Sequence, residues 1–158
     1  MPIENKLVVH PTLGICTITE SDLKSEKMTL TAVSDQGCQC TFPKKSFKLI
    51  GIRELITKEY ASKLVDSIFH PAVAEFDKDK MNPRKIEEVI RGKEISDKAF
   101  VYSYLLYQKY TKERIGSVNS TYLQRVEENL CEELSYVLSI DGDEMIKELV
   151  CSYKNMIH

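Results

Sequence analysis

The chain has 158 residues and a mass of 18.2 kDa, which is the length of one domain or two small ones. With 42% hydrophobic and 29% charged residues, its composition excludes disordered, collagen-like and disulfide-dense proteins. Charged or polar residues interrupt every apolar stretch before it reaches the roughly 18 residues of a membrane span. The amino terminus has no basic segment followed by an apolar run, so we expect a cytoplasmic protein.

The net charge of −2 is unevenly distributed along the chain. Residues 1–60 carry a net +1, residues 61–115 a net +2, and residues 116–158 a net −5. Proteins that bind nucleic acid through charge alone usually have a strongly basic domain. Any DNA contact would therefore come from a local and modest patch in the middle third.

The first 53 residues have the pattern of short strands. Turn residues separate runs that alternate and are rich in β-branched side chains. Strands are predicted over residues 7–10, 15–19, 27–33 and 38–42, with a short fifth over 47–53. Several short strands at this spacing predict a small β-barrel of the Tudor or SH3 kind.

After Ile56 the hydrophobic period changes from two to about 3.6 residues, which predicts helices. Caps are expected at Thr57, Asn82, Asn119 and Asp141, and residues 70–82 are expected to be a linker or loop. The predicted helices run from residue 57 to 69, 83 to 91, 96 to 114, 119 to 138 and 141 to 155. The predicted fold class is α+β: a Tudor/SH3-like small β-barrel in residues 1–55, then a bundle of four or five helices in residues 56–158.

No pattern of catalytic chemistry stands out. The five cysteines are expected to be reduced, and Cys38-Gln39-Cys40 lacks the two-residue spacer of zinc knuckles. The three histidines suggest no nucleophile–base pair, and the six scattered glycines form no phosphate-binding loop. Asp141-Gly142-Asp143-Glu144 fits a helix cap better than a calcium loop. We expect no catalytic residue, metal, cofactor or small-molecule substrate, and hence no enzyme.

The predicted helix over residues 96–114 is rich in aromatic residues. Phe100, Tyr104 and Tyr107 share one face, and two interpretations are open. The face is buried with its hydroxyls at the rim, or it stacks on bases or on a partner protein. Because Arg and Lys are not interleaved with these rings, we favour burial.

Two stretches of the chain are similar to one known family. Residues 8–18 (VVHPTLGICTI) resemble the opening strand–turn–strand of CarD/CdnL-like bacterial transcription regulators. Phe42-Pro43, followed by residues 49–55 (LIGIREL), resembles the end of the same module. The predicted helices also match in order, so the resemblance covers nearly the whole chain. It implies a Tudor-like domain that docks on the β subunit of RNA polymerase, and a helical domain that contacts promoter DNA beside the melted bubble.

The resemblance also implies residues for polymerase binding. Family members pair basic residues near the barrel edge with acidic residues of the polymerase. One of these positions aligns with Lys24 and the other with Thr41, which carries no charge. Lys27, Lys44 or Lys45 can take the place of the missing basic residue.

The DNA-binding residues follow from the same resemblance. The family wedges a tryptophan into the minor groove, but this chain has no tryptophan. The aligned position is Lys78, and Phe76 is the candidate wedge, unless it only packs the linker against the helices. The implied basic cluster consists of Lys78, Lys80, Arg84, Lys85, Arg91 and Lys93.

We therefore expect a transcription regulator that binds the polymerase β subunit and modulates the stability of the promoter open complex. Its contact with promoter DNA would be weak and not sequence-specific, and no membrane is expected as a partner. The alternative is a protein–protein adaptor with an SH3/Tudor-like barrel that does not contact DNA. The acidic last third and the missing tryptophan favour the adaptor, whereas the basic cluster in residues 78–93 favours the regulator.

Overall fold

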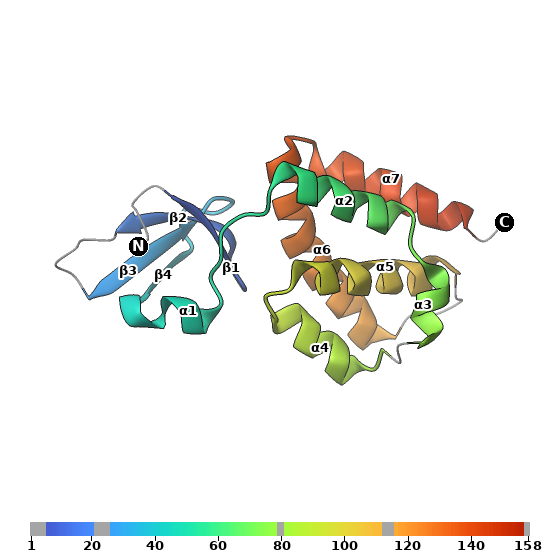
Figure 1. Cartoon of the computed structure of the whole chain (residues 1–158), viewed down its shortest axis with the longest axis horizontal. Coiled ribbons are helices and arrows are strands. Elements are labelled where there is room, and N and C mark those ends of the chain that lie inside the picture. The colour runs from blue at the N-terminus through green and yellow to red at the C-terminus, as the bar shows by residue number, and fades with distance from the viewer. Residues whose placement is uncertain (1–5, 21–25, 79–80, 112–115, 157–158) are drawn as a thin grey trace. The chain divides into compact units, whose positions relative to one another are not determined.

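In the part of the chain that the structure describes, four strands come first and the long helices follow (Figure 1). This computed structural model describes residues 6–20, 26–78, 81–111 and 116–156. The chain divides into two compact units, Met1–Leu55 and Ile56–His158, which we call unit 1 and unit 2. The boundary falls where the hydrophobic period changes. The predicted α+β class is confirmed.

Unit 1 is an antiparallel sheet with the strands in chain order. The strands are β1 (Leu7–His10), β2 (Gly14–Glu20), β3 (Lys27–Ala32) and β4 (Gln39–Pro43). Alternation places Met28, Leu30 and Ala32 on the core face, where each is at most 3% exposed. All four predicted strands are confirmed. Among the described residues β1 does not pair with β4, so the sheet is not closed as the predicted barrel would be.

The predicted fifth strand is wrong. Residues Lys44–Ser46 form the 3₁₀ helix η1, and Phe47–Ile50 form the short helix α1. Phe47 and Ile50, three residues apart, both pack on the core, which a helical turn allows and a strand does not. Gly51 then ends the turn with φ of 93°. What remains of a fifth strand is a bridge in which Val9 and Arg53 exchange main-chain bonds of 2.7 and 3.1 Å.

Unit 2 consists of helices whose starts follow the predicted caps in three places. Thr57 accepts a bond from the Tyr60 N–H at 3.2 Å, and Asn82 accepts one from the Lys85 N–H at 2.9 Å. Asp141 caps the last helix by accepting from two N–H groups. The helices are α2 (Lys58–Phe69), α3 (Val73–Lys78), α4 (Pro83–Arg91), α5 (Ile95–Thr111), α6 (Ser117–Leu138) and α7 (Gly142–Asn155).

Two helix predictions need correction. Asn119 is not a cap, because α6 begins at Ser117, directly after the extended Gly116. The expected loop 70–82 contains the helix α3, which Phe76 anchors in the hydrophobic interior. None of the helices in the described part of the chain has the length and hydropathy of a membrane-spanning segment.

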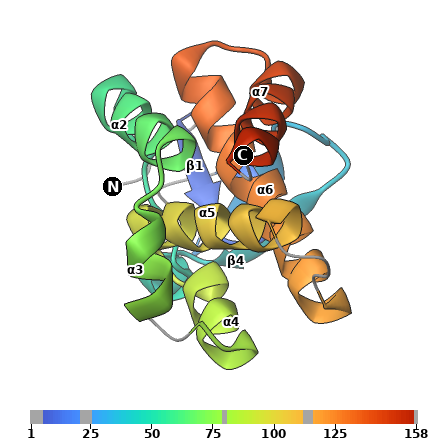
Figure 2. The ribbon, with the colours of Figure 1, turned by 90° about the vertical axis from the view of Figure 1, so that its right-hand side faces the viewer.

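Helix α5 lies at the centre of unit 2. Figure 2 shows it crossing the unit with α2 and α7 above and α4 below, and it packs against all of these and α6. Val101, Tyr102 and Leu105 on this helix have no exposed surface. At the start of the unit, the buried carboxylate of Glu133 on α6 accepts a bond from the Ile56 N–H at 3.0 Å. The other helices of unit 2 thus pack around α5, and together they position the charged side chains on the surface of the unit.

Candidate functional site

The outer edge of β4 is one candidate interface. Among the described strands β4 pairs with β3 alone. The Ala32 N–H donates to the Cys38 carbonyl at 3.0 Å, and bonded pairs alternate along an antiparallel ladder. The main-chain groups of Gln39 and Thr41 therefore point away from β3. An edge with outward donors and acceptors is a template for a strand of another chain.

Thr41, one of the two residues that the resemblance implies for polymerase binding, lies in the middle of this edge. Its side chain is exposed on the face opposite the core, with its hydroxyl 2.9 Å from that of Thr29. The other implied residue, Lys24, lies outside the described residues. The strand itself contributes no positive charge, so any charge must come from its end.

Lysines gather where β4 ends. Lys44 and Lys45 follow Pro43 directly, and the exposed Lys27 is the register partner of Pro43 across the ladder. An open hollow of about 380 Å³ lies here, and the described residues that line it are Glu26, Pro43, Lys44 and Lys45. The edge of β4 thus ends in a hollow whose described lining carries two lysines and one glutamate.

Four members of the predicted basic cluster lie on α4 or directly after it. Ile86 and Ile90 are buried on one side of this helix, which leaves Arg84 and Arg91 exposed on the other. Arg84 lies 3.6 Å from Glu88 one turn later, and Lys85 is half-buried beside the cap. The last predicted member, Lys93, is exposed in the turn between α4 and α5.

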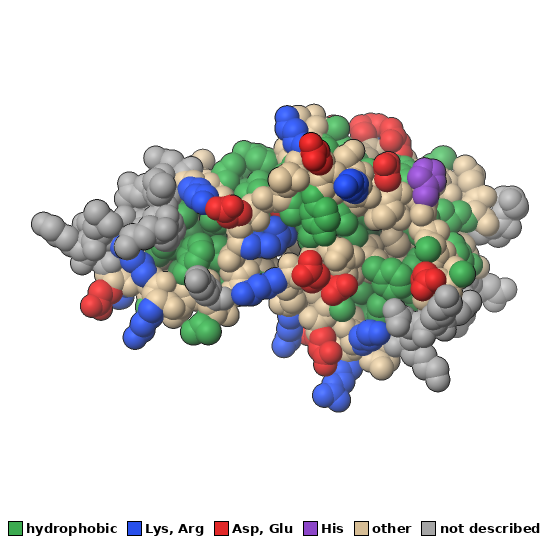
Figure 3. Space-filling view, in the orientation of Figure 1, with side chains coloured by type: hydrophobic (Ala, Val, Ile, Leu, Met, Phe, Trp, Pro, Cys, Tyr) green, Lys and Arg blue, Asp and Glu red, His purple; other side chains and the backbone are tan. Residues whose placement is uncertain are grey.

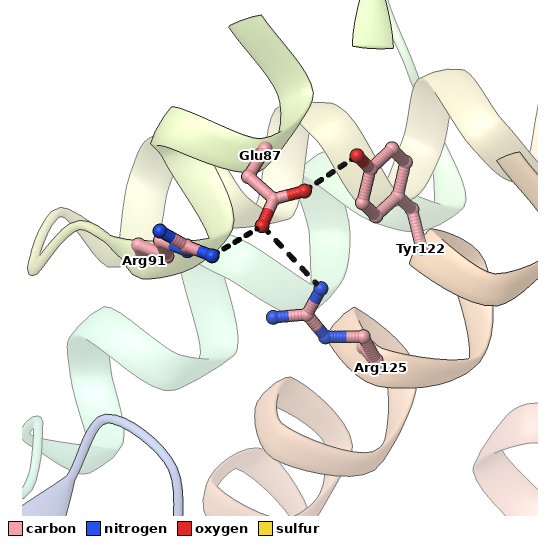
Figure 4. A network of polar contacts seen from close by, with 4 residues as sticks. All are labelled: Glu87, Arg91, Tyr122 and Arg125. Carbon is pink, nitrogen blue, oxygen red and sulfur yellow. Dashed lines mark hydrogen bonds and ion pairs between the residues drawn. The ribbon is translucent and has the colours of Figure 1, made fainter. Parts of the chain in front are cut away.

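Glu87 joins α4 to α6 (Figure 4). One of its oxygens, Oε1, lies 2.8 Å from Arg91 on its own helix and 3.9 Å from Arg125 on α6. The other oxygen, Oε2, accepts a hydrogen bond of 2.5 Å from the hydroxyl of Tyr122. Three side chains from two helices therefore meet at the carboxylate of Glu87.

The groups around Glu87 favour the ionised form of its carboxylate. The bond from Tyr122 lowers the pKa of Glu87, and the positive charges of Arg91 and Arg125 lower it further. The same bond raises the pKa of Tyr122, because ionising the phenol beside a carboxylate is unfavourable. At neutral pH Glu87 is thus ionised and Tyr122 keeps the proton that it donates.

The structure does not place Phe76 where a DNA wedge would have to be. Its side chain is 5% exposed and lies among Phe100, Tyr104 and Tyr107, with ring centroids 5.4, 5.7 and 5.4 Å away. Phe76 therefore packs its segment against the helices, which is the alternative to the wedge. The aromatic face of α5 is the surface on which it packs. Of the two remaining predicted residues, Lys78 ends α3 with its side chain outside what is described, and Lys80 lies outside the described residues.

The structure therefore describes four of the six side chains of the predicted basic cluster. The structure brings Arg91 close to Arg125, which no sequence pattern had suggested, and keeps Arg84 on the same exposed side of α4. The spacing of Glu87 and Arg91 signals an ion pair within a helix, but nothing local signals their partners on α6. On the face that Figure 3 presents, Lys and Arg side chains alternate with Asp and Glu and form no continuous basic surface.

Other chemistry is sparse in the described part of the chain. There, no group of three or more His, Cys, Asp or Glu side chains is placed to hold a metal ion. Cys38 is exposed and Cys40 is half-buried. No protein-family model matches this chain, and a search of curated proteins finds no match.

Proposed function

We propose that this protein is a bacterial transcription regulator of the CarD/CdnL-like kind, which binds the β subunit of RNA polymerase through unit 1 and contacts promoter DNA through unit 2. The observation that carries the proposal is the outer edge of β4, which no other described strand covers and which ends in lysines. The bridge between Val9 and Arg53 supports a Tudor-like module, since it returns the chain after α1 to the opposite edge of the sheet.

Binding to the polymerase would extend the sheet by one strand. Main-chain groups of Gln39 and Thr41 offer hydrogen bonds that do not depend on the partner's side chains. Lys44 and Lys45, with Lys27 beside them, favour a partner whose segment carries acidic residues where β4 ends. These lysines supply the charge that Thr41 lacks.

Contact with DNA would rest on charge, because Phe76 is buried. Arg84 and Arg91 lie along the exposed side of α4, and Lys85 and Lys93 lie at its two ends. Phosphate contacts of this kind carry no sequence information. The protein would act on the promoter complex by binding one of its states more tightly than another, which shifts the balance between them.

The experiment that tests the proposal is a titration of the full-length protein against the β subunit of a bacterial RNA polymerase. Thr41→Pro removes the outward N–H without touching the ladder to β3, whereas Thr41→Val keeps that N–H. We expect Thr41→Pro and the double change Lys44→Glu with Lys45→Glu to weaken binding at least tenfold. Thr41→Val and the exposed Lys63→Glu on α2 should bind like the wild type.

Thermal melting of each variant shows whether the sheet is intact. The proposal is contradicted if the folded wild type does not bind the β subunit. It is also contradicted if Thr41→Pro and the lysine double variant are folded and bind as tightly as the wild type.

The second candidate function is a protein–protein adaptor that never contacts DNA. The burial of Phe76 favours it, since the aromatic residue proposed as a wedge packs in the interior and does not reach the surface where DNA would bind. Salt dependence separates the two candidates. A DNA-contacting protein loses affinity for a promoter complex steeply as salt rises, whereas an apolar adaptor contact does not.

A further inference from the structure

We infer that Arg91 and Arg125 together grip one backbone phosphate of DNA, with Glu87 and Tyr122 as positioning residues. We call this pair of guanidinium groups the arginine clamp. The inference rests on the DNA-contacting half of the proposed function and extends it to a residue on α6.

The geometry places both guanidinium groups on one carboxylate oxygen, at 2.8 and 3.9 Å (Figure 4). The side chains remain accessible, with 74% of Arg91 and 43% of Arg125 exposed. Each guanidinium has five N–H donors, so contact with Glu87 leaves several that can reach an anion. Forked guanidinium donors match phosphate oxygens well.

Glu87 makes this arrangement possible. Two guanidinium groups brought this close repel each other, and the carboxylate between them offsets that repulsion. The three charges sum to +1, so the clamp still attracts phosphate. The carboxylate thus holds the two arginines together before DNA arrives, which reduces the entropy lost on binding.

Tyr122 holds the carboxylate in turn. It donates to the oxygen that the arginines do not use, and its ring lies 6.0 Å from the Arg125 guanidinium carbon. The Tyr122 ring thus orients Arg125, and the Tyr122 hydroxyl orients Glu87. Tyr122 is therefore a positioning residue and does not itself contact DNA.

The surroundings favour a nucleic-acid backbone over an isolated carboxylate. Arg84 lies seven residues before Arg91, or about two turns along the same exposed side of α4. A further guanidinium therefore lies along the helix away from the clamp, and its contact with Glu88 at 3.6 Å leaves it 90% exposed. A row of phosphates can engage both points, whereas a single acidic side chain engages only one.

The test uses full-length protein and a fluorescently labelled 30-base-pair duplex, titrated at several salt concentrations. Arg91→Ala and Arg125→Ala are each expected to weaken binding several-fold and to lower the salt slope by up to about 0.9, the value of one phosphate contact. Because both residues would serve the same phosphate, the double variant should lose less than the two single losses combined.

A matched pair on α4 separates positioning from simple charge. Glu87→Ala and Glu88→Ala each remove one negative charge from neighbouring positions of the same helix. If charge alone matters, both variants bind DNA more tightly. The clamp requires Glu87→Ala to bind several-fold more weakly than wild type, while Glu88→Ala binds as tightly or more tightly. Tyr122→Phe should weaken binding in the same direction as Glu87→Ala, and thermal melting verifies folding.

The outcomes distinguish the two levels of the proposal. If Arg84→Ala weakens DNA binding but Arg91→Ala and Arg125→Ala do not, the clamp is wrong and DNA contact by unit 2 stands. If Glu87→Ala binds more tightly than wild type, its positioning role is wrong. If folded wild-type protein does not bind the duplex at low salt, both the clamp and the DNA-contacting half of the proposed function fail.

Discussion

Thiols and phenols in this protein differ in acidity according to what surrounds them. Burial raises the pKa of Cys131 to about 12 and that of Tyr153 to about 12. The Tyr153 hydroxyl donates to the Ile68 carbonyl at 2.7 Å and so ties α7 to α2. Cys38 is exposed, yet its pKa is also raised, because its thiol donates to the Asp35 carboxylate at 3.3 Å. Exposure alone therefore does not make a thiol of this chain reactive.

The thiol of Cys38 gives a prediction at the residue scale. Asp35→Asn removes the negative charge that raises the thiol's pKa, so more thiolate is present at pH 8 and alkylation should be several-fold faster. Asparagine retains the turn, in which Asp35 accepts from the Gly37 N–H at 3.0 Å. Mass spectrometry of iodoacetamide labelling measures the rate at each cysteine. Cys151, exposed on α7, is the internal control, and equal rates at Cys38 in both proteins would contradict the prediction.

At the scale of elements, α3 shows how one side chain can hold a short helix in place. Its six residues are too few to form a stable helix alone, and their stability comes from tertiary packing. Phe76 supplies that packing against Phe100, Tyr104 and Tyr107, with two of the three rings edge-on. The aromatic face of α5 is therefore a receptor for α3, and an aromatic that stabilises the scaffold is not free to intercalate.

Phe76→Ala is expected to lower the free energy of unfolding by about 3 kcal/mol, the lower end for removing a buried phenyl group. Phe76→Leu should cost less because it leaves a smaller cavity. Urea denaturation followed by circular dichroism measures both, and Ala74→Ser at an exposed position of α3 is the control. Unchanged stability of Phe76→Ala, together with a loss of promoter binding, would instead support the wedge.

At the scale of the whole molecule, the two units have separate hydrophobic cores. The core of unit 1 includes Leu30 and Phe42, and that of unit 2 includes Leu105 and Leu134. No buried residue belongs to both clusters among those described. Stability is therefore expected to be set separately in each unit.

This separation predicts two independent responses to core substitutions. Leu30→Ala should lower the stability of unit 1, and Leu105→Ala that of unit 2, each by about 2–5 kcal/mol. Native-state hydrogen exchange of the full chain measures both units at once, because the most protected amides report unfolding of their own unit. Equal loss of protection in both units from either substitution would show that they unfold together, contrary to the prediction.

Much of the fold could be predicted because its signals are local. Alternation marked four strands, and Thr57, Asn82 and Asp141 marked three helix starts within a few residues of each cap. The fifth strand was predicted wrongly because the short apolar run over residues 47–53 does not by itself distinguish a strand from a helical turn, and packing of both Phe47 and Ile50 on the core selected the helical turn. The helix α3 was not predicted because its six residues are too few to show a helical period. The residue that anchors it, Phe76, packs on rings that lie more than 20 positions later in the sequence.

The candidate sites also combine features that depend on neighbouring residues with features that depend on tertiary packing. The sequence by itself determined the order of the four strands and of the longer helices, the lysines after β4, and the arginines of α4, since each depends only on neighbouring residues. Only the tertiary structure decided that β4 is an edge, that Phe76 is buried, and that Arg125 meets Arg91 at Glu87. The bond from Tyr122 to Glu87 spans 35 positions, and no local preference sets a contact at that separation. The packing of α4 on α6 brings these residues together.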